Sequence, residues 1–245
     1  MELQKEFENQ GNWLFRHRGW LPFIILIPGF IFHLHEQSEE QFPQGKPAIW
    51  IYYEYLCLLI SIIGLAIRIY TIGYAQNNTS GRNTKTQVAD SLNIKGIYSI
   101  VRHPLYLGNF LMWFGVALLI RDVEFIIAVS AIFCIYYERI MYAEEQFLKK
   151  KFDEQFLQWA ACTPAFFPRF KQYQRTNGKF NYKKVLKGEK NGLVAIFLIF
   201  FIFDSSGMLV RGNFRYNYFL ITCAIVSVIF YLILKYLKHK TTLLN

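Results

Sequence analysis

Two pairs of ionisable residues lie beside long apolar stretches of this chain. Arg102 and His103 precede Pro104, and Glu144 and Glu145 follow about 40 residues later. Charge is costly next to hydrocarbon, so ionisable residues that are kept there usually serve a function. Cations and carboxylates together suit a ligand that carries both signs of charge. The four side chains therefore predict a binding site for a zwitterion.

The apolar residues come in runs that are long enough for membrane helices. Hydrophobic residues make up 53% of the 245 residues, and aromatic residues make up 18%. A helix needs roughly 20 residues to cross about 30 Å of hydrocarbon. Six runs approach that length: 20–34, 49–72, 105–120, 125–142, 192–210 and 216–236. We therefore expect an all-α integral membrane protein with about six transmembrane helices.

The distribution of Lys and Arg predicts how these helices are oriented. With six crossings and both termini in the cytoplasm, about 21 of the 27 basic residues fall on the cytoplasmic side, as the positive-inside rule predicts. The outer segments hold only Lys46, Arg121, Arg211 and Arg215. The net charge of +10 then reflects this bias and attraction to anionic headgroups. Because the chain has no compact basic domain, we expect no nucleic-acid partner.

The chain divides into three parts. Residues 1–75 form an N-terminal transmembrane hairpin, 76–175 carry the motifs, and 176–245 contain a basic linker and a closing hairpin. The start of the chain is polar, so we expect no cleavable signal peptide. The four cysteines are dispersed without a CxxC pair, and we expect neither disulfides nor a metal site.

The two apolar runs of the middle part are joined by only two residues. So short a connection forces the two helices to lie antiparallel as neighbours. Their cytoplasmic ends are then adjacent, which brings Arg102 and His103 close to Arg139, Glu144 and Glu145.

Pro104 marks the start of a helix, because proline is tolerated in a first turn and pushes the residue before it out of helical geometry. Arg102 and His103 then lie at a helix N-terminus, where the dipole favours an anion. Residues 144–159 carry apolar side chains at helical spacing, which predicts an amphipathic helix on the cytoplasmic face. This helix would roof a pocket with cations at one end, carboxylates at the other and aromatics between. An amino acid that bears an adenosine suits such a pocket.

The order GIYSIVRHPLYLGNF, a tight helical hairpin, EExxL, an amphipathic helix and PxxxP resembles the integral-membrane methyltransferases that include isoprenylcysteine carboxyl methyltransferase and phospholipid methyltransferases. The resemblance covers about residues 94–170. It implies that S-adenosylmethionine binds on the cytoplasmic side and that a membrane lipid or lipidated acceptor enters from the bilayer. The residues that match the family motif are Tyr98, Arg102, His103, Pro104, Tyr106, Gly108, Glu144 and Glu145, with Pro164 and Pro168 as the closing prolines.

The resemblance also implies roles for these residues. Arg102 or Arg139 would orient the acceptor anion, and His103 with the helix N-terminus would hold the cofactor carboxylate. Glu144 or Glu145 would take the ammonium group and favour the sulfonium. Transfer to an ionised phosphate or carboxylate oxygen needs no strong base, so positioning and desolvation would supply most of the acceleration. If the acceptor were an amine, one glutamate could instead remove the proton.

The chain departs from the family in one motif and adds a polar loop. The family often has FGxxYxxY where residues 152–159 read FDEQFLQW, so a glycine and two tyrosines are replaced. The loop before the motif, which contains Arg82, is similar to a bacterial branch that methylates lipid A phosphate. That likeness implies a bacterial inner membrane.

Other functions stay open from the sequence. The chain could be a phospholipid N-methyltransferase, an NADPH-dependent membrane reductase of the sterol-reductase type, or a non-enzymatic scaffold or carrier. A reductase should have more helices before the motif and more contacts for phosphates. In a scaffold the charges would be structural: Arg102 would bind headgroups, His103 would cap a helix, and Arg139 would snorkel to the interface.

Overall fold

The computed structural model describes residues 2–39, 47–76, 79, 87–176, 178–212 and 216–240. The long helices in these ranges are α1 (Leu3–His17), α2 (Leu21–Glu39), α3 (Ala48–Tyr74), α4 (Pro104–Leu118), α5 (Val123–Cys162), α6 (Tyr182–Val210) and α7 (Tyr218–Lys240). Two short 3-10 helices, η1 (Ile97–Ser99) and η2 (Phe170–Gln172), lie between them. The described part of the chain holds no named strand, which confirms the prediction of an all-α protein.

Three helices, α3, α6 and α7, are long and apolar enough to cross a membrane. The pair α1 and α2 is bent by 73° and counts as a fourth candidate span if it is taken as one. Each of the six predicted apolar runs is helical, but three to four candidate spans are fewer than the six crossings predicted. The difference arises partly because α4 is only 15 residues long.

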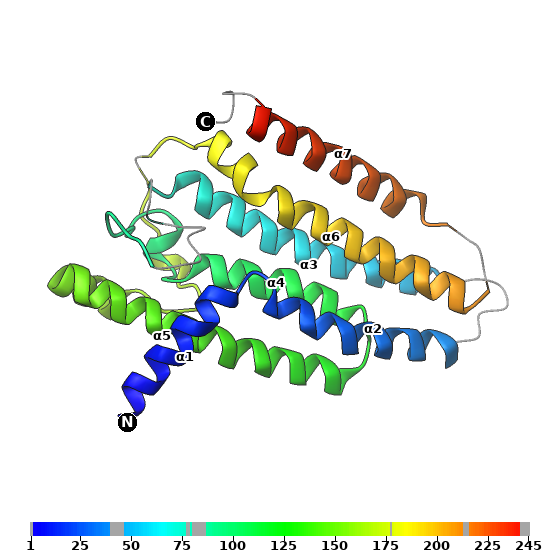
Figure 1. Cartoon of the computed structure of the whole chain (residues 1–245), viewed down its shortest axis with the longest axis horizontal. Coiled ribbons are helices and arrows are strands. Elements are labelled where there is room, and N and C mark those ends of the chain that lie inside the picture. Colours follow the sequence, from blue (N-terminus) through cyan, green and yellow to red (C-terminus); the bar gives the residue numbers. More distant parts are fainter. Residues whose placement is uncertain are drawn as a thin grey trace.

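The helices form an elongated bundle (Figure 1). Helix α3 lies between α4 and α6, α2 also packs on α6, and α7 covers the outer side of α6. Small residues bring α3 and α4 together: a Cβ on Gly64 would lie 2.5 Å from the carbonyl oxygen of Gly108. Close approach through small residues is typical of helix packing in membranes.

Helix α5 is longer than the sequence analysis predicts. Asp122 caps its N-terminus by accepting a hydrogen bond from Phe125 N (2.5 Å). The apolar run and the amphipathic stretch then form one helix, interrupted by a non-helical residue at Asp153 (φ 39°) and ending at Cys162. No Gly or Pro separates the two stretches, so nothing stops the helix between them.

Helix α1 and the first turns of α6 were not predicted. Helix α1 crosses α5 and contacts its middle (Figure 1). Its Gly11 packs directly against the carbonyl oxygen of Arg139, and a Cβ at position 11 would clash with that oxygen. Helix α6 starts at Tyr182, ten residues before its apolar run, so the predicted basic linker is partly helical. Both additions lie near the motif residues.

Candidate active site

The RHP sequence is held by backbone hydrogen bonds from the strap, which we define as residues 163–174 after α5. Arg102 N donates to Pro164 O (2.9 Å), and His103 N donates to Ala165 O (3.1 Å). The strap therefore fixes the backbone of both residues. The PxxxP sequence lies within the strap, so Pro164 is held beside Arg102, whereas a role of the two prolines in the site stays a prediction.

Helix α4 begins where the sequence predicts. Pro104 is its first residue, and His103 before it has non-helical angles (φ −118°, ψ 60°). Proline has no N–H, so its place in the first turn leaves no backbone donor unpaired. The carbonyl of His103 accepts the first hydrogen bonds of the helix, from Tyr106 N (3.1 Å) and Leu107 N (3.2 Å). His103 is thereby anchored at the N-terminus of α4, facing α5.

Arg102 and His103 contact the paired glutamates directly. Arg102 Nε donates to Glu145 Oε1 (2.8 Å), and Arg102 Nη1 donates to the carbonyl oxygen of Ala160 (2.8 Å). Glu145 Oε1 also lies 2.9 Å from His103 Nε2, and His103 Nδ1 lies 3.5 Å from Glu144 Oε2. The predicted separation of cations and carboxylates at opposite ends of a pocket is therefore wrong. Because α5 continues unbroken past the N-terminus of α4, it carries both glutamates level with His103.

The contacts shift the pKa values of the central pair. Burial alone would lower the pKa of His103, but hydrogen bonds and charge attraction from Glu144 and Glu145 outweigh it and raise that pKa. Burial alone would raise the pKa of Glu145, but His103 and Arg102 outweigh it and lower that pKa. Both shifts favour an imidazolium beside a carboxylate. His103 is therefore a poor general base in this state.

These side chains face a cavity of about 480 Å³, which we call the motif cavity. Six predicted site residues line it: Tyr98, Arg102, His103, Pro104, Tyr106 and Glu144. Tyr106 Oη donates to Glu144 Oε1 (2.8 Å), which orients that carboxylate. The volume falls within the range of small-molecule sites, roughly 300 to 1,000 Å³. The motif thus surrounds a space that is large enough for a cofactor.

The other four predicted site residues do not line the motif cavity. Glu145 lies beside it, bound to Arg102 and His103. Gly108 lies at the crossing of α3 and α4, and Pro168 lies in the strap. The guanidinium carbon of Arg139 lies 3.4 Å from the centre of a ring in α1. Arg139 therefore contacts α1, and this geometry does not place it against a ligand in the cavity.

A second ion pair, formed by Arg68 and Glu189, also lines the motif cavity. Arg68 of α3 donates from Nε and Nη2 to the two carboxylate oxygens of Glu189 in α6 (2.7 Å each) and from Nη1 to Asn109 Oδ1 (2.5 Å). A Cβ on Gly108 would lie 2.6 Å from the Arg68 side chain, so glycine gives the arginine its space. The bidentate geometry is the strong form of such a pair.

Helix α1 supplies a wall of the cavity that sequence reasoning missed. Phe15 and Arg18 both line it. The signal was present, because Leu3, Phe7 and Leu14 recur near one face at helical spacing. The polar composition of this helix hides that face from a search for membrane spans.

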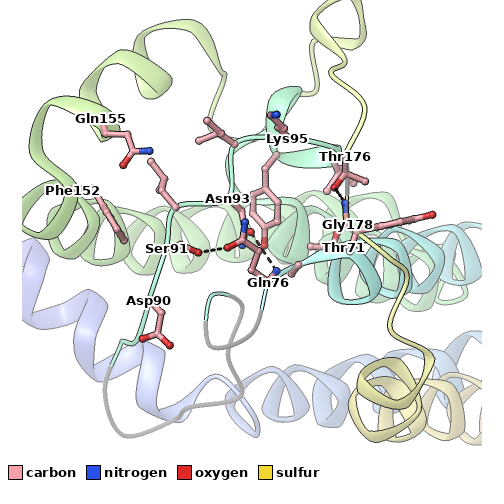
Figure 2. A pocket seen from close by; sticks show the side chains of 16 residues that line it. Thr71, Gln76, Asp90, Ser91, Asn93, Lys95, Phe152, Gln155, Thr176 and Gly178 are labelled. Atoms are coloured by element: carbon pink, nitrogen blue, oxygen red, sulfur yellow. Dashed lines mark hydrogen bonds between the residues drawn. The ribbon is translucent and has the colours of Figure 1, made fainter.

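A second cavity of about 610 Å³ adjoins the first (Figure 2). We call it the amide cavity because amides and hydroxyls dominate its polar lining: Thr71, Gln76, Ser91, Asn93, Gln155 and Thr176. Ser91 Oγ donates to Gln76 Oε1 (2.5 Å), and Asn93 Oδ1 accepts from Gln76 N (3.4 Å). Asp90 and Lys95 are its charged lining residues.

Tyr98 belongs to the wall between the two cavities, because it lines both. The carbonyl oxygen of Tyr98 accepts a hydrogen bond from Trp159 Nε1 (2.9 Å). Trp159 stands at the position of the second tyrosine in the FGxxYxxY pattern, so here an indole makes this contact. Burial raises the pKa of Tyr98, and the nearby Glu144 raises it further. The phenol therefore stays protonated and able to donate a hydrogen bond. Phe152 and Gln155, in the same altered motif, line the amide cavity.

Within the described ranges, no three His, Cys, Asp or Glu residues are grouped closely enough to hold a metal ion. Arg82, in the polar loop before the motif, lies outside the described residues.

Comparison with known families gives one match. The family model for phospholipid methyltransferases matches residues 53–155. That segment runs from α3 into the second half of α5 and contains the RHP and EE residues, but not α1, the strap or α6. The site-bearing core of this chain is thus similar to a family of membrane methyltransferases that act on lipids. No solved structure shows a significant match.

Two curated proteins are similar over about half of the chain. The cobalt-zinc-cadmium resistance protein CzcN of Cupriavidus metallidurans is 32% identical over 119 residues, which cover 48% of this chain and 52% of that protein. The nickel-cobalt-cadmium resistance protein NccN of Alcaligenes xylosoxydans xylosoxydans is 29% identical over 118 residues, 47% of this chain and 53% of that protein. The match thus spans about half the length of these relatives.

Proposed function

We propose that this chain is an S-adenosylmethionine-dependent methyltransferase that modifies an oxygen of a membrane lipid or lipidated substrate. The observation that carries the proposal is the motif cavity, where a partly buried set of paired charges lines a space of ligand size. The family match to phospholipid methyltransferases over the same segment supports it.

The residues that line the motif cavity suit the proposed cofactor. Glu144 is a carboxylate for its ammonium group, and protonated His103 at the N-terminus of α4 is a donor for its carboxylate. Tyr98 and Trp159 add aromatic side chains to the same lining, which suits its adenine. The donor set therefore covers both charges and the ring of the cofactor.

When bound, the cofactor would supply a methyl group activated by a sulfonium. The protein would then need to hold the acceptor oxygen in line with that methyl group and exclude water. Glu145 would fix Arg102 and His103, and Arg139 would hold α1 against the cavity. No strong base is needed for a phosphate or carboxylate oxygen, which agrees with the raised pKa of His103.

The finer assignments are part of the proposal. The site would face the cytoplasm of a bacterium from its inner membrane, as the positive-inside bias favours. The acceptor would be a phosphate or carboxylate, with lipid A phosphate as the particular candidate from the polar loop before the motif. An amine acceptor is the second candidate, because the matching family model is that of phospholipid methyltransferases.

The test is thermal stabilisation of the detergent-solubilised chain by S-adenosylmethionine, S-adenosylhomocysteine and NADPH. A ligand that binds only the folded state raises its apparent stability. We expect stabilisation by the first two and none by NADPH. A response to NADPH alone would favour a reductase, and no response to any of the three would favour a scaffold or carrier.

A further inference from the structure

Neutral polar groups dominate the lining of the amide cavity. Its amides and aliphatic hydroxyls are those of Thr71, Gln76, Ser91, Asn93, Gln155 and Thr176. Asp90 and Lys95 add one charge of each sign. Amides and hydroxyls offer donors and acceptors together, which complements a ligand whose own groups do both. An anion is bound better by arginine, and an apolar ligand would leave these groups unpaired. The lining therefore favours a neutral ligand that carries several hydroxyls.

Part of this lining is held in place by hydrogen bonds, and part can bond a ligand. Gln76 Oε1 accepts from Ser91 Oγ (2.5 Å), and Gln76 N donates to Asn93 Oδ1 (3.4 Å). In the part of the chain that the structure describes, the Tyr98 hydroxyl and the Gln155 amide have no hydrogen-bond partner. Burial raises the pKa of Tyr98, so its hydroxyl is a donor. The first group of residues shapes the cavity, and the second can bind its occupant.

The amide cavity also has aromatic side chains. Figure 2 shows Phe152 and Gln155 of α5 on one side of the cavity and Thr71 and Thr176 on the other. In a sugar, hydroxyls project from the edge of the ring, whereas C–H bonds cover its two faces. Such faces pack on aromatic rings while the hydroxyls bond to amides. The volume of about 610 Å³ lies within the range of small-molecule sites, roughly 300 to 1,000 Å³. A sugar therefore fits both kinds of lining.

The amide cavity lies where a membrane span ends and beside the motif cavity. Thr71 and Tyr74 belong to the last turn of α3, a candidate span, and Gln76 follows it. The end of a span lies at the level of the lipid headgroups. The residues that line both cavities are Ser91, Leu92, Asn93 and Tyr98. A ligand in the amide cavity is thus at headgroup level and next to the proposed cofactor site.

We propose that the amide cavity binds a sugar in the headgroup of the methyl acceptor, so that the acceptor is a glycolipid. The inference rests on the proposed function for the role of the motif cavity as the cofactor site. The sugar is the neutral part of the headgroup. The oxygen that receives the methyl group belongs to the same headgroup and reaches the motif cavity across the shared wall.

The experiment compares the full chain with Gln155→Trp and with Gln158→Trp. Both glutamines are exposed on α5, but only Gln155 lines the amide cavity, so only a tryptophan at position 155 fills it. The proteins are held in octaethylene glycol dodecyl ether, because a maltoside detergent would itself supply a sugar. Thermal stabilisation is titrated with monoglucosyl-dioleoylglycerol, with dioleoylglycerol, with free glucose and, separately, with S-adenosylhomocysteine. Melting temperatures without ligand show that each variant is folded.

We expect monoglucosyl-dioleoylglycerol to stabilise the unchanged chain and Gln158→Trp, and to bind at least about tenfold more tightly than dioleoylglycerol or glucose. In Gln155→Trp its apparent affinity should fall at least about tenfold, because the sugar is excluded. Gln155→Leu keeps the space and loses a neutral hydrogen bond, so its affinity should fall roughly threefold to tenfold. S-adenosylhomocysteine should stabilise all four proteins equally.

Four results would overturn the inference. The first is equal affinity of the unchanged chain for monoglucosyl-dioleoylglycerol and dioleoylglycerol. The second is a Gln155→Trp protein that binds the glycolipid as tightly as Gln158→Trp does. The third is glucose that binds as tightly as the glycolipid, which would make the ligand a soluble sugar. The fourth is loss of S-adenosylhomocysteine binding in Gln155→Trp alone, which would place the adenosine of the cofactor in the amide cavity.

The proposed function is tested separately by the same data. Failure of S-adenosylhomocysteine to stabilise any of the four proteins would reject it. The lipid titrations would still decide whether the amide cavity binds a sugar headgroup, because they do not require the cofactor.

Discussion

The motif cavity and the amide cavity share a wall but differ in their chemistry. In the motif cavity, Arg68, Arg102 and His103 are each paired with a glutamate. The amide cavity has a polar lining made mainly of amides and hydroxyls that bond to one another. Charges are expensive to bury unless they are paired, so a protein keeps them where they do something that neutral groups cannot. The contrast indicates that the two cavities serve different purposes.

The two cavities also differ in how they are assembled. The charged residues of the motif cavity lie in α3, α5 and α6, just after α1 and just before α4, so most of the long helices help to place them. Most of the amide cavity comes from loop residues 90–98 and from the turn around Gly178, with α3 and α5 at its edges (Figure 2). The cavity with the paired charges is therefore built mainly at helices, whereas the amide cavity is built largely on loops.

The largest effect is expected for Glu145→Gln, which removes a carboxylate that pairs with residues of the motif cavity. The change leaves Arg102 and His103 without their shared carboxylate, and an unpaired charge of this kind is costly. We expect methyl transfer to membrane lipids to fall at least about a hundredfold, roughly the effect of losing 3 kcal/mol of site organisation. Labelled methyl transfer measures it. Glu154→Gln, on the exposed face of the same helix, is the control and should keep nearly full activity; equal activity in both variants would contradict the role of the pair.

The ion pair of Arg68 and Glu189 should have its largest effect on stability. Glu189→Gln leaves Arg68 buried beside a neutral amide, and we expect a loss of about 3 kcal/mol in the free energy of unfolding. The double variant Arg68→Met with Glu189→Leu should recover most of that stability, because it removes both charges. Thermal unfolding in detergent measures both. A double variant that is less stable than the single one would show that the pair is favourable by itself.

The charge pair at the motif also predicts a pH dependence. The raised pKa of His103 stabilises the fold at pH values below its ordinary value of about 6.5, and this contribution is lost as the pH rises through the raised value. The lowered pKa of Glu145 stabilises the fold above its ordinary value of about 4.5 and is lost as the pH falls through the lowered value. The melting temperature should thus be highest at pH values between the lowered pKa of Glu145 and the raised pKa of His103. In His103→Gln the loss on the alkaline side should disappear; an unchanged alkaline limb would exclude His103 as its cause.

The smallest effect is expected in the amide cavity. Gln155→Trp would fill it from the exposed face of α5, without touching a charge. S-adenosylhomocysteine should stabilise this variant as much as it stabilises Gln158→Trp, a neighbouring exposed glutamine that does not line the cavity. Isothermal titration of the two variants measures the difference. A tenfold weaker affinity in Gln155→Trp would show that the cofactor extends into the amide cavity.

Much of the motif cavity could be predicted because its signals are local. Pro104 fixes the start of α4, and the two-residue connection at Arg121 and Asp122 makes α4 and α5 antiparallel. These two facts place His103 near Glu144 and Glu145 without knowledge of the rest of the fold. The direct contact between them could not be predicted, since it depends on α5 continuing as a helix past residue 142.

The parts that sequence reasoning missed depend on contacts between distant segments. Arg18 reaches the cavity only because Gly11 packs on α5, and no local pattern specifies that contact. Arg68 finds its partner in Glu189, at the start of a helix whose apolar run begins later. Helical periodicity shows which face of α1 is apolar, but not which helix that face will meet.

The pair of Arg68 and Glu189 has a consequence for biosynthesis. The two residues are 121 positions apart, so α3 emerges from the ribosome long before the residue that neutralises its arginine. An arginine within an apolar helix costs about 2.5 to 3.5 kcal/mol to insert at the centre of a bilayer, and less near the interface. Until α6 is made, Arg68 has to be accommodated by Asn109, water or headgroups. Insertion of α6 therefore completes the site and at the same time releases α3 from an unfavourable position in the membrane.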